Sequence, residues 1–425
     1  MTTQTINIII LGGGYSGVMA ALRLASKTKR LDTTVTLVNA LEHFVERPRL
    51  HEQATGMVPT NCSIAHMLRG TKARFVQGWV TAIDPAQQCV HAQTTHGEQQ
   101  LAYDYLVNAL GSRVNRHLIP GVHDHAFTLD PYGDLTIEAL KSKLTASGKN
   151  AFRVVVVGGG ATGVEAATQV KGRYPHSEVS IVTQGQVGDF KGAHVQKHII
   201  EALREQAITI HENARVNRVE QAGVVLDSGR IPADVIIWAG GFVASPLARE
   251  AGLRVNAQNQ VLVDPYLRSL SHPNIYAVGD AASPVEEPGV PTRMSLFTAL
   301  VSGAQAAENI AAEMKGQSPQ PLSFVWYGQG IALGPHDAVG FGTYPADVAW
   351  PLILRRMLAH KIRDFFVWYL GAALELERRL PGSFYWNGKN RYAQQKRRQK
   401  QETLKKGTDG TKGIKGTEGE SSLSS

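Results

Sequence analysis

The chain has 425 residues, 43% of them hydrophobic and 19% charged, so it is long enough for two or three ordinary globular domains. No uncharged apolar run reaches about 18 residues, which argues against a spanning helix, and the start MTTQTINIII leaves no room for a cleaved signal peptide. The two cysteines, Cys62 and Cys89, exclude a disulfide framework and indicate a reducing, cytoplasmic compartment.

The net charge of +8 is concentrated near the C-terminus. From Pro351 onward, 16 Lys and Arg stand against 7 Asp and Glu, whereas the preceding 350 residues carry 28 basic and 29 acidic residues. The basicity therefore belongs to the C-terminal region. A basic tail of this kind is usually solvated, and it indicates no specific nucleic-acid partner.

A glycine-rich stretch opens the chain. IIILGGGYSGVMAA, residues 8–21, predicts a strand over 6–11, a tight turn and a helix over 15–29. Glycines at these spacings allow the turn, the approach of a pyrophosphate and the packing of helix on strand, with phosphates at the helix N-terminus. The predicted nucleotide contacts are Gly12, Gly13, Gly14, Tyr15, Ser16 and Gly17.

Strand signals continue through the first unit. VTLVN ends at Asn39, ARFVQG and WVTAID follow, and YLVNALGS ends at Ser112. This order predicts a doubly wound α/β sheet with parallel strands. The Pro-, Gly- and Asp-rich segment 119–132 is typical of a linker.

The same plan then recurs roughly 146 residues later. VVVVGGGATGVEAA, residues 154–167, predicts a strand over 153–157 and a helix over 161–173, after a predicted helix near 133–147. One such fingerprint is weak evidence, but two in the same context are a strong signal. The predicted contacts here are Gly158, Gly160, Ala161, Thr162 and Gly163.

Later segments complete the domain plan. Strand EVSIV, a helix over 193–206 and VIIWAGG at 235–241 finish the second unit, and VLVDPYL and NIYAVGDAA return to the first. Helix is expected over 292–315, strands and turns over 324–345 and helix over 350–380. We therefore predict a first domain from residues 1–118 and 256–320, an inserted domain over 119–255, a C-terminal strand and helix region over 321–387, and a disordered basic tail over 388–425.

This layout, with VGD at 278–280 and ALGS at 109–112, resembles the two-dinucleotide-binding-domain flavoproteins of the glutathione-reductase type. The resemblance implies two Rossmann-like domains, with FAD on the first fingerprint and NAD(P)H on the second. It implies that Asp280 hydrogen-bonds the FAD ribitol and that Val80, Ala109 and Gly111 contact the flavin nucleotide. Disulfide reductases of this type need a redox Cys pair close in sequence, and here the two cysteines are 27 residues apart.

FVERPRLHEQATG, residues 44–56, is similar to a stretch of the type II NADH dehydrogenases, and QVKGRYPHSEVSIV resembles the second domain of that branch, which includes apoptosis-inducing-factor-like proteins. In such relatives hydride passes from NAD(P)H to flavin N5, and electrons then pass to a quinone. Arg47 and Glu46 would lie near the flavin, or form a simple surface pair. Glu165 would lie at the nicotinamide–flavin contact, or serve only as a first-turn helix acid, and Ala239 and Gly240 would close on the nicotinamide.

Several positions depart from the branch pattern. Phe297 and Val301 occupy the places of a glutamine pair at the quinone end of the flavin, so the acceptor stays open. It is a quinone-like molecule or a small redox protein, or else the chain is a slow redox sensor. Asn39 replaces the acid that would bind ribose, and Thr183 follows the matching second-domain strand, which leaves NADH and NADPH equally allowed.

Two remaining features have competing interpretations. His194 and His198 are four residues apart on a predicted helix, and His123 and His125 flank Asp124. Neither pair has the ligand set of a known metal site, so a solvated helix face is favoured for the first pair and solvated linker residues for the second. RRMLAHKIRDFFVWYLGAALELERR either lies on a membrane, or covers the flavin domain or a second copy of the chain. In the membrane case Arg355, Arg356, Lys361 and Arg363 would face anionic headgroups.

Overall fold

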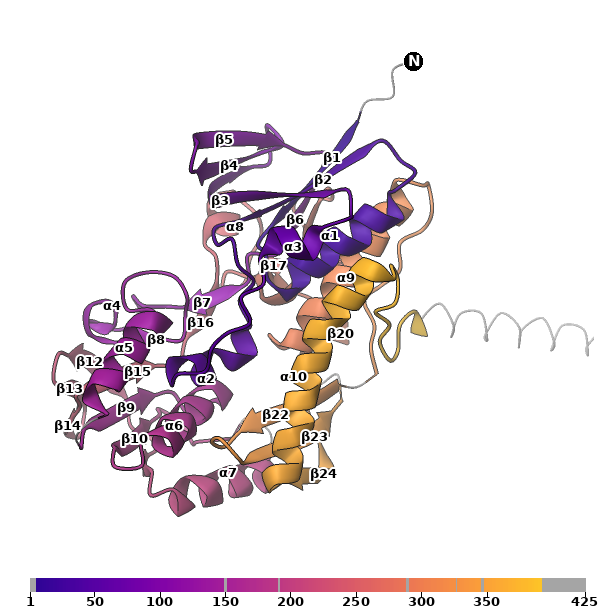
Figure 1. Cartoon of the computed structure of the whole chain (residues 1–425). Helices are drawn as coiled ribbons and strands as arrows, with labels where there is room; N and C mark the ends of the chain where they lie inside the picture. Colours follow the sequence, from indigo (N-terminus) through magenta and orange to yellow (C-terminus); the bar gives the residue numbers. More distant parts are fainter. Residues whose placement is uncertain are drawn as a thin grey trace, which may run out of the picture.

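The computed structural model describes residues 5–148, 151–189, 192–287, 290–325, 327–344 and 348–391. Two α/β lobes, each built on a parallel sheet, are joined by a small C-terminal sheet and a long helix (Figure 1). Most of the predicted basic tail, residues 392–425, lies outside the described residues.

The first lobe is built on a seven-stranded sheet with the order β18-β6-β1-β2-β3-β4-β5. Its strands are β1 (Ile6–Leu11), β2 (Thr33–Asn39), β3 (Ala73–Asp84), β4 (Cys89–Thr94), β5 (Gly97–Ala102), β6 (Tyr105–Asn108) and β18 (Ile275–Ala277). The strands from β18 to β3 pair in parallel, and β4 and β5 extend the sheet as antiparallel neighbours. The central strand β1 is apolar and buried from Ile8 to Leu11, as expected of a parallel strand covered on both faces.

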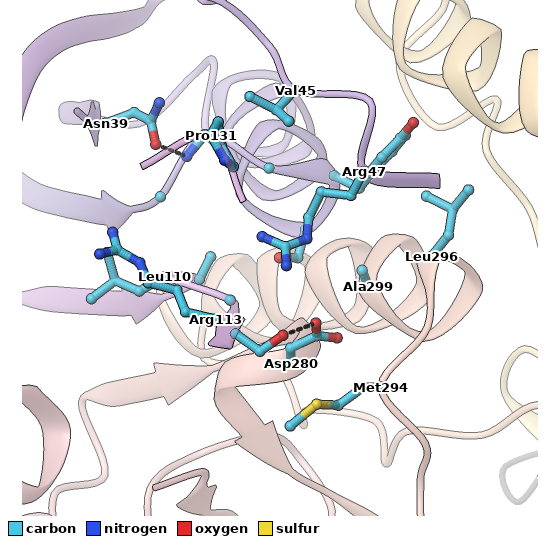
Figure 2. Close-up of a pocket in the computed structure, with 18 of the residues that line it drawn as sticks. Asn39, Val45, Arg47, Leu110, Arg113, Pro131, Asp280, Met294, Leu296 and Ala299 are labelled. Carbon is cyan, nitrogen blue, oxygen red and sulfur yellow. Dashed lines mark hydrogen bonds between the residues drawn. The ribbon is translucent and has the colours of Figure 1, made fainter. Parts of the chain in front are cut away.

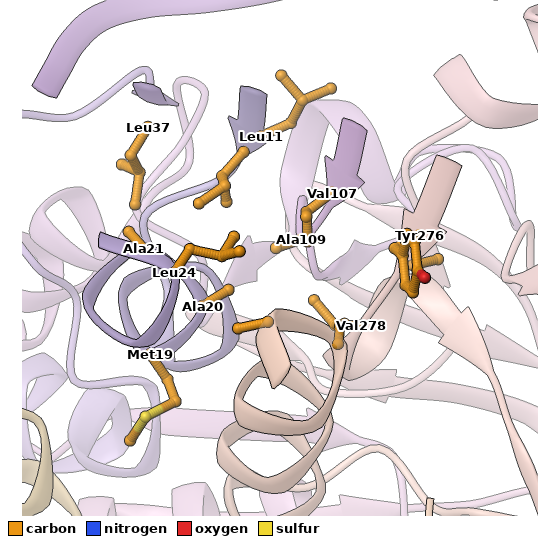
Figure 3. Packing of buried hydrophobic residues seen from close by; sticks show 14 of the residues in the cluster. Leu11, Met19, Ala20, Ala21, Leu24, Leu37, Val107, Ala109, Tyr276 and Val278 are labelled. Atoms are coloured by element: carbon orange, nitrogen blue, oxygen red, sulfur yellow. The ribbon is translucent and has the colours of Figure 1, made fainter. Parts of the chain in front are cut away.

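Helices α1 (Tyr15–Lys27) and α9 (Leu296–Glu313) pack against each other beside this sheet. A methyl group at Gly303 would lie 2.3 Å from the Ser16 carbonyl oxygen, so the two helices meet at a point where only glycine fits. Figure 3 shows Met19, Ala20, Ala21 and Leu24 of α1 within the core formed with the sheet. This close packing fixes the start of α1, where the glycine turn ends.

The second lobe is built on a five-stranded sheet with the order β11-β10-β9-β15-β8, all parallel. Its strands are β8 (Phe127–Thr128), β9 (Arg153–Val157), β10 (Glu178–Val182), β11 (Thr209–His211) and β15 (Val235–Trp238). Its helices are α5 (Ile137–Ser147), α6 (Ala161–Arg173) and α7 (Ala193–Glu205). An antiparallel sheet of β12 (Val216–Glu220), β13 (Gly223–Leu226) and β14 (Gly229–Pro232) adjoins it. Because β18 joins the first sheet only after this whole lobe, the second sheet is inserted within the first in the chain order.

Short elements connect the two lobes. β7 (Ser112–Val114) pairs antiparallel with β16 (Phe242–Ala244). The segment that leaves the first lobe and the segment that returns to it therefore run side by side. The other short strands are β17 (Val261–Leu262), β19 (Ala282–Ser283), β20 (Val285–Glu287) and β21 (Val290–Pro291). The short helices are η1 (Arg47–Arg49), α2 (Leu50–Ala54), α3 (Ile64–Leu68), α4 (Val122–His125), α8 (Leu247–Glu250) and η2 (Gly279–Ala281).

The C-terminal region contacts both lobes. β22 (Tyr327–Ala332), β23 (Ala338–Thr343) and β24 (Ala349–Arg355) form an antiparallel sheet whose Ile331, Val339 and Phe341 belong to the core of the second lobe. α10 (Arg356–Arg379) then runs toward the first lobe, where Ala373 and Leu374 join the other core (Figure 1). In the described part of the chain, no helix is both long enough and apolar enough to cross a bilayer.

Three expectations of local structure were wrong. The segment 119–132 is more than a linker, because it contains α4 and the edge strand β8 of the second sheet. ARFVQG and WVTAID are one continuous strand, β3. The region 350–380 is not uniformly helical, because 349–355 forms β24, which pairs antiparallel with β23.

Candidate active site

A cleft opens beside the first glycine loop. The space between its walls has a volume of about 940 Å³, which includes the part open to solvent. It is lined by residues from the loop, from the segment after β2, from the ends of β6 and β7, from the loop before α5 and from the start of α9 (Figure 2). The lining combines backbone N–H groups, two arginines, one half-buried carboxylate and apolar side chains. Such a mixture suits an elongated ligand with charged and flat apolar parts.

The first glycine loop has the geometry that a phosphate requires. Gly12 has φ +102°, a conformation that favours glycine, and a methyl group at Gly17 would lie 1.8 Å from the Gly12 carbonyl oxygen. Gly14 caps α1, and a methyl group there would meet nothing within 4 Å, because the position faces the open cleft. Tyr15 and Ser16 follow as the first residues of α1, so the helix N-terminus points at the cleft.

The second glycine loop repeats this geometry. Gly158 has φ +130°, and a methyl group at Gly163 would lie 1.9 Å from the Gly158 carbonyl oxygen. Gly160 caps α6 and faces open space, with Ala161 and Thr162 next along the helix. The Ala239 backbone lies against Gly158, as the Ala109 backbone lies against Gly12. The Gly240 carbonyl accepts a hydrogen bond from Trp238 Nε1 at 3.0 Å.

The polar residues after β2 and β10 hold the loops in equivalent ways. Asn39 Oδ1 accepts from the Gly13 N–H at 2.8 Å, and Asn39 Nδ2 donates to the Leu41 carbonyl at 2.8 Å. Thr183 packs so closely on Gly159 that a methyl group there would lie 2.8 Å from its hydroxyl oxygen. Asn39 lines the cleft, and its amide keeps a second N–H and a second oxygen lone pair that suit a ribose hydroxyl.

Asp280 provides the half-buried carboxylate of the cleft. It lies on η2, and Ser112 Oγ donates a hydrogen bond to its Oδ2 at 2.7 Å (Figure 2). Burial raises the pKa of Asp280, while the Ser112 hydrogen bond and the charge of Arg47 act in the opposite direction. Ala109 and Gly111, on the turn before β7, complete this wall. The ALGS motif and the GD motif, far apart in sequence, therefore meet at one point.

Two arginines supply positive charge. Arg47 reaches into the middle of the cleft above Asp280, whereas its neighbour Glu46 is not among the lining residues (Figure 2). Arg113, on β7, packs against the rings of both Trp79 and Tyr132. In the described part of the chain, neither guanidinium makes a hydrogen bond or an ion pair. Because Arg donors are rarely left without acceptors, both groups point to an anionic ligand.

A second group of charged side chains lies behind the cleft, where α2, α6, β22 and α10 meet. Arg363 of α10 donates to Glu52 at 2.6 Å and to the Pro48 carbonyl at 3.0 Å, and its guanidinium lies 4.0 Å from Glu165. Glu165 Oε1 accepts from the Ala332 N–H at 3.1 Å. Glu165 is therefore not a solvated first-turn acid of α6, since it reaches across to β22.

Burial and charge shift the pKa values in this cluster. Burial raises the pKa of Glu165 to about 7, although Arg363 and the Ala332 N–H favour its ionised form. Burial alone would also raise the pKa of Glu52, but the adjacent Arg363 brings it below its ordinary value. Burial, together with the charge of Arg363, lowers the pKa of His51 to about 3 and keeps this side chain neutral. Glu165 is thus the member that can gain or lose a proton near neutral pH.

Other predicted residues lie away from the cleft. Val80 is buried in the first core on β3 and does not line the cleft, while the preceding residue, Trp79, is 42% exposed. Val301 is fully buried within α9, and the Phe297 ring packs edge-on against Phe324 at 5.8 Å between centroids. Of the four cations expected to face headgroups, Arg363 is buried and Arg356 pairs with Glu205 and Asp337.

The histidines and cysteines take other roles. His194 contacts the Trp350 carbonyl oxygen at 3.0 Å and His198 is buried, so they do not form a solvated helix face. Across the described ranges, His, Cys, Asp and Glu side chains nowhere gather into a group able to hold a metal ion. Cys62 is half-buried, Cys89 is buried, and neither lines the cleft.

Sequence reasoning missed Arg113, Tyr132 and Arg363. Arg113 directly follows the ALGS motif, so its place beside the cleft could have been inferred. Tyr132 was assigned to a linker, and Arg363 was assigned to a lipid-facing surface. The Arg363 contacts join residues more than 300 positions apart, and no local pattern reports them.

The family model for pyridine nucleotide-disulphide oxidoreductases matches residues 6–307. The chain belongs to this family. The match confirms the predicted α/β fold class and the oxidoreductase activity, with FAD and a nicotinamide nucleotide as the cofactors of the family.

Similar proteins include two curated relatives of nearly the same length. The type II NADH:quinone oxidoreductase of Haemophilus influenzae is 26% identical over 405 residues, covering 80% of this chain and 89% of the relative. The demethylphylloquinone reductase NdbB of Synechocystis sp. is 29% identical over 378 residues, covering 84% of this chain and 92% of the relative.

Among solved structures, the NDH2 protein of Plasmodium falciparum in complex with NADH has a TM-score of 0.71 at 18% identity, covering 89% of this chain and 99% of that one. The sulfide:quinone oxidoreductase of Aquifex aeolicus has a TM-score of 0.72 at 19% identity, covering 89% and 93%. At these identities the likeness concerns the fold.

Proposed function

We propose that this oxidoreductase transfers electrons from NAD(P)H through FAD to a quinone. The main support is that the geometry of the glycine loop occurs twice in the chain. The loop of the first lobe borders a cleft whose lining suits an anion and contains no cysteine. FAD, when bound, supplies the hydride acceptor and passes the electrons on. The names of the two curated relatives, both quinone reductases, support this choice of acceptor.

The cleft residues fit FAD. The N–H groups of the first loop and the α1 N-terminus suit the diphosphate, together with the guanidinium groups of Arg47 and Arg113. Asn39 Oδ1 suits a ribose hydroxyl, and the half-buried Asp280 carboxylate, oriented by Ser112, suits the hydroxyls of the ribitol chain. The apolar side chains of Met294 and Leu296 suit the flavin end.

The second loop suits the electron donor, with the Gly160 position open to a diphosphate. Thr183, at the end of β10, contributes no carboxylate that would repel a 2′-phosphate. We propose that Ala239 and Gly240 line the nicotinamide side of this site. NADH is the donor in the solved complex of similar fold, and NADPH is the alternative that the test below distinguishes.

The acceptor site would be apolar. Phe297, beside Phe324, is the ring available at the position where the type II pattern has a glutamine. Val301 is fully buried and does not reach a ligand. An aromatic wall suits a flat quinone ring through stacking, although it removes a hydrogen-bond donor. Reduction of a quinone consumes two protons, and Glu165 is placed to deliver one of them from behind the cleft.

We further propose that α10 contacts a membrane, where a quinone dissolves. Large apolar side chains of this helix are exposed, with Trp368 62% exposed; they are Met357, Leu358, Phe365, Phe366, Trp368, Tyr369 and Leu376. Lys361 and Arg355 are exposed near them and suit anionic headgroups. The same face could instead pair with a second copy of the chain, which sedimentation in the absence of lipid would reveal.

Anaerobic stopped-flow absorbance at flavin wavelengths tests the function. We expect the purified protein to be yellow, to bleach with NADH or NADPH, and to recover its colour within the mixing experiment when a short-chain quinone is added. The faster of the two donors identifies the preference. Absence of flavin would contradict the proposal, and bleaching without recovery would exclude quinone and favour a protein acceptor or a slow redox sensor.

A further inference from the structure

A three-residue stack lies at one wall of the FAD cleft. The Arg113 guanidinium carbon is 4.6 Å from the centre of the Trp79 ring and 4.3 Å from that of the Tyr132 ring. The two rings meet edge-to-face at 5.7 Å. Arg113 and Tyr132 both line the cleft, so this group of side chains faces the proposed cofactor.

A guanidinium held over aromatic rings by cation–π attraction makes no hydrogen bond to them, so its N–H donors stay available for an acceptor. In the described part of the chain, Arg113 has no hydrogen-bond acceptor and no carboxylate partner. Its orientation is therefore set by the rings, and its donors remain for a ligand. A free arginine would lose rotamer freedom on binding an anion, whereas a stacked one has already lost it.

The three residues come from separate parts of the fold. Trp79 belongs to β3 of the first lobe, and Arg113 belongs to the connecting strand β7. Tyr132 lies in the loop between β8 and α5, which belong to the second lobe. The stack therefore closes across the junction of the two lobes.

The loop that carries Tyr132 is firmly built. The Thr128 N–H donates to the Leu135 carbonyl at 3.2 Å, which closes the loop at its base. Arg116 then donates to Thr128 Oγ1 at 2.7 Å and to the Leu135 carbonyl at 3.0 Å. The Tyr132 N–H donates to Asp130 Oδ1 at 3.1 Å, and Asp130 is itself buried. Tyr132 is thus held in place before any ligand arrives.

We propose that Trp79 and Tyr132 form a clamp that aims Arg113 at the phosphates of FAD and so sets the rate at which the cofactor leaves. Trp79 and Tyr132 are positioning residues, and their effect on FAD passes through Arg113. This inference rests on the proposed FAD site.

The test measures FAD release from the purified holoprotein, followed as the rise in flavin fluorescence after dilution to nanomolar concentration. We expect Trp79→Ala and Tyr132→Ala each to release FAD about 10-fold faster than the wild type. Trp79→Phe and Tyr132→Phe keep a ring and should stay close to the wild-type rate. Arg113→Met should release FAD at least as fast as the alanine variants, and Arg113→Lys should not restore slow release, because an ammonium lacks the planar fork.

Double variants decide whether the rings act through Arg113. In an Arg113→Met background, adding Trp79→Ala should change the release rate by less than about 2-fold. Tyr385→Ala removes an exposed aromatic side chain that faces a lysine outside the cleft, and it should leave release unchanged. Melting temperatures of all variants identify any that fail to fold, and the two Phe variants keep the test valid in that case.

Two results would overturn the clamp. Unchanged release in both alanine variants would show that the rings do not hold the cofactor. Additive acceleration in the Arg113→Met background would show that the rings contact FAD independently of Arg113. A wild-type protein without flavin would instead contradict the proposed function itself, so the two failures are distinguishable.

Discussion

Arg363 Nη1 donates a hydrogen bond to Glu52 Oε1 at 2.6 Å, although the two residues are 311 positions apart in the chain. Arg363 belongs to α10, and Glu52 belongs to α2, directly after the Arg47–Pro48 segment of the cleft wall. The same guanidinium approaches Glu165 of the second lobe. One side chain from the C-terminal helix therefore joins the first lobe and the second lobe at the proposed site of electron transfer.

Replacing Arg363 by Met should destabilise the folded protein by about 3 kcal/mol, because it removes the buried partner of the Glu52 carboxylate and leaves it paired with the less buried Arg49. Urea unfolding of the FAD-bound protein at pH 7.5 measures the change. Arg379→Met serves as the control, since Arg379 is exposed and, among the described residues, pairs only with Glu375, and it should change stability by less than about 0.5 kcal/mol. Equal effects of the two variants would refute an interior role for Arg363.

Glu165→Gln should remove a pH dependence centred near neutrality. Burial raises the pKa of Glu165 to about 7, so it carries a proton below that pH and loses it above. Reoxidation of the reduced enzyme by quinone should therefore slow as the pH rises through about 7 in the wild type. In the Gln variant, reoxidation at pH 6 should be slower by on the order of 100-fold, with no inflection near 7. Stopped-flow absorbance between pH 5.5 and 8.5 provides the comparison.

The raised pKa of Glu165 also predicts a pH dependence of the free energy of unfolding, which can be measured without catalysis. A carboxyl whose folded pKa lies above its ordinary value of 4.5 stabilises the fold at low pH, and this contribution is lost as the pH rises toward about 7. Glu165→Gln should remove this loss, whereas Glu138→Gln, at an exposed position on α5, should not. An unchanged pH dependence in the Gln variant would argue against a shifted Glu165.

Matched alanine substitutions separate the two glycine loops. Gly14 and Gly160 have extended backbone angles open to any residue, and added methyl groups would meet nothing in the protein. Gly14→Ala should fold but bind FAD weakly, because its methyl group occupies the cleft. Gly160→Ala should fold and keep its FAD, and it should need a higher NADH concentration for half-maximal flavin bleaching.

Two measurements on these variants suffice, namely the ratio of flavin to protein absorbance and the NADH dependence of bleaching. Gly17→Ala gives the contrast, since its methyl group would collide with the Gly12 carbonyl and the protein should not fold. If Gly14→Ala kept FAD and Gly160→Ala lost it, the assignment of the two loops would be reversed.

Exposed aromatic side chains on α10 give a lipid-binding prediction. Phe365→Ser with Trp368→Ser should reduce co-sedimentation with vesicles of mixed anionic and zwitterionic lipid by about 10-fold, because two large apolar groups no longer enter the interface. Flavin content and NADH-driven bleaching should be unaffected. Tyr385→Ser, an exposed aromatic site outside α10, should bind vesicles like the wild type. Full binding by the double variant would exclude this face as the lipid contact.

Local patterns were sufficient to predict the nucleotide-binding framework. The two fingerprints lead from β1 into α1 and from β9 into α6, as the spacing of their glycines indicates. The return of the chain to the first sheet was also predicted, because the GD motif at Asp280 follows a short apolar strand. These features depend on neighbours in the sequence, and neighbours are what a sequence pattern records.

Features that depend on distant neighbours were not predicted. The sequence around Arg363 is basic and aromatic, which also describes a membrane-facing helix, and only its contact with Glu52 shows that it is interior. Trp79 and Arg113 lie in segments that were recognised, but their stacking with Tyr132 requires a loop that looked like a linker. Val80 was expected at the cofactor and instead lies in the core, because β3 presents its neighbour Trp79 outward.

The course of α10 has a consequence for how substrates enter. This helix of 24 residues begins beside the β22–β24 sheet on the second lobe and ends on the first lobe, where Glu377 pairs with the fully buried Arg23 of α1. A helix that packs on both lobes in this way favours one angle between them. We therefore expect the donor nucleotide to enter a site that is already assembled, without hinge closure of one lobe on the other.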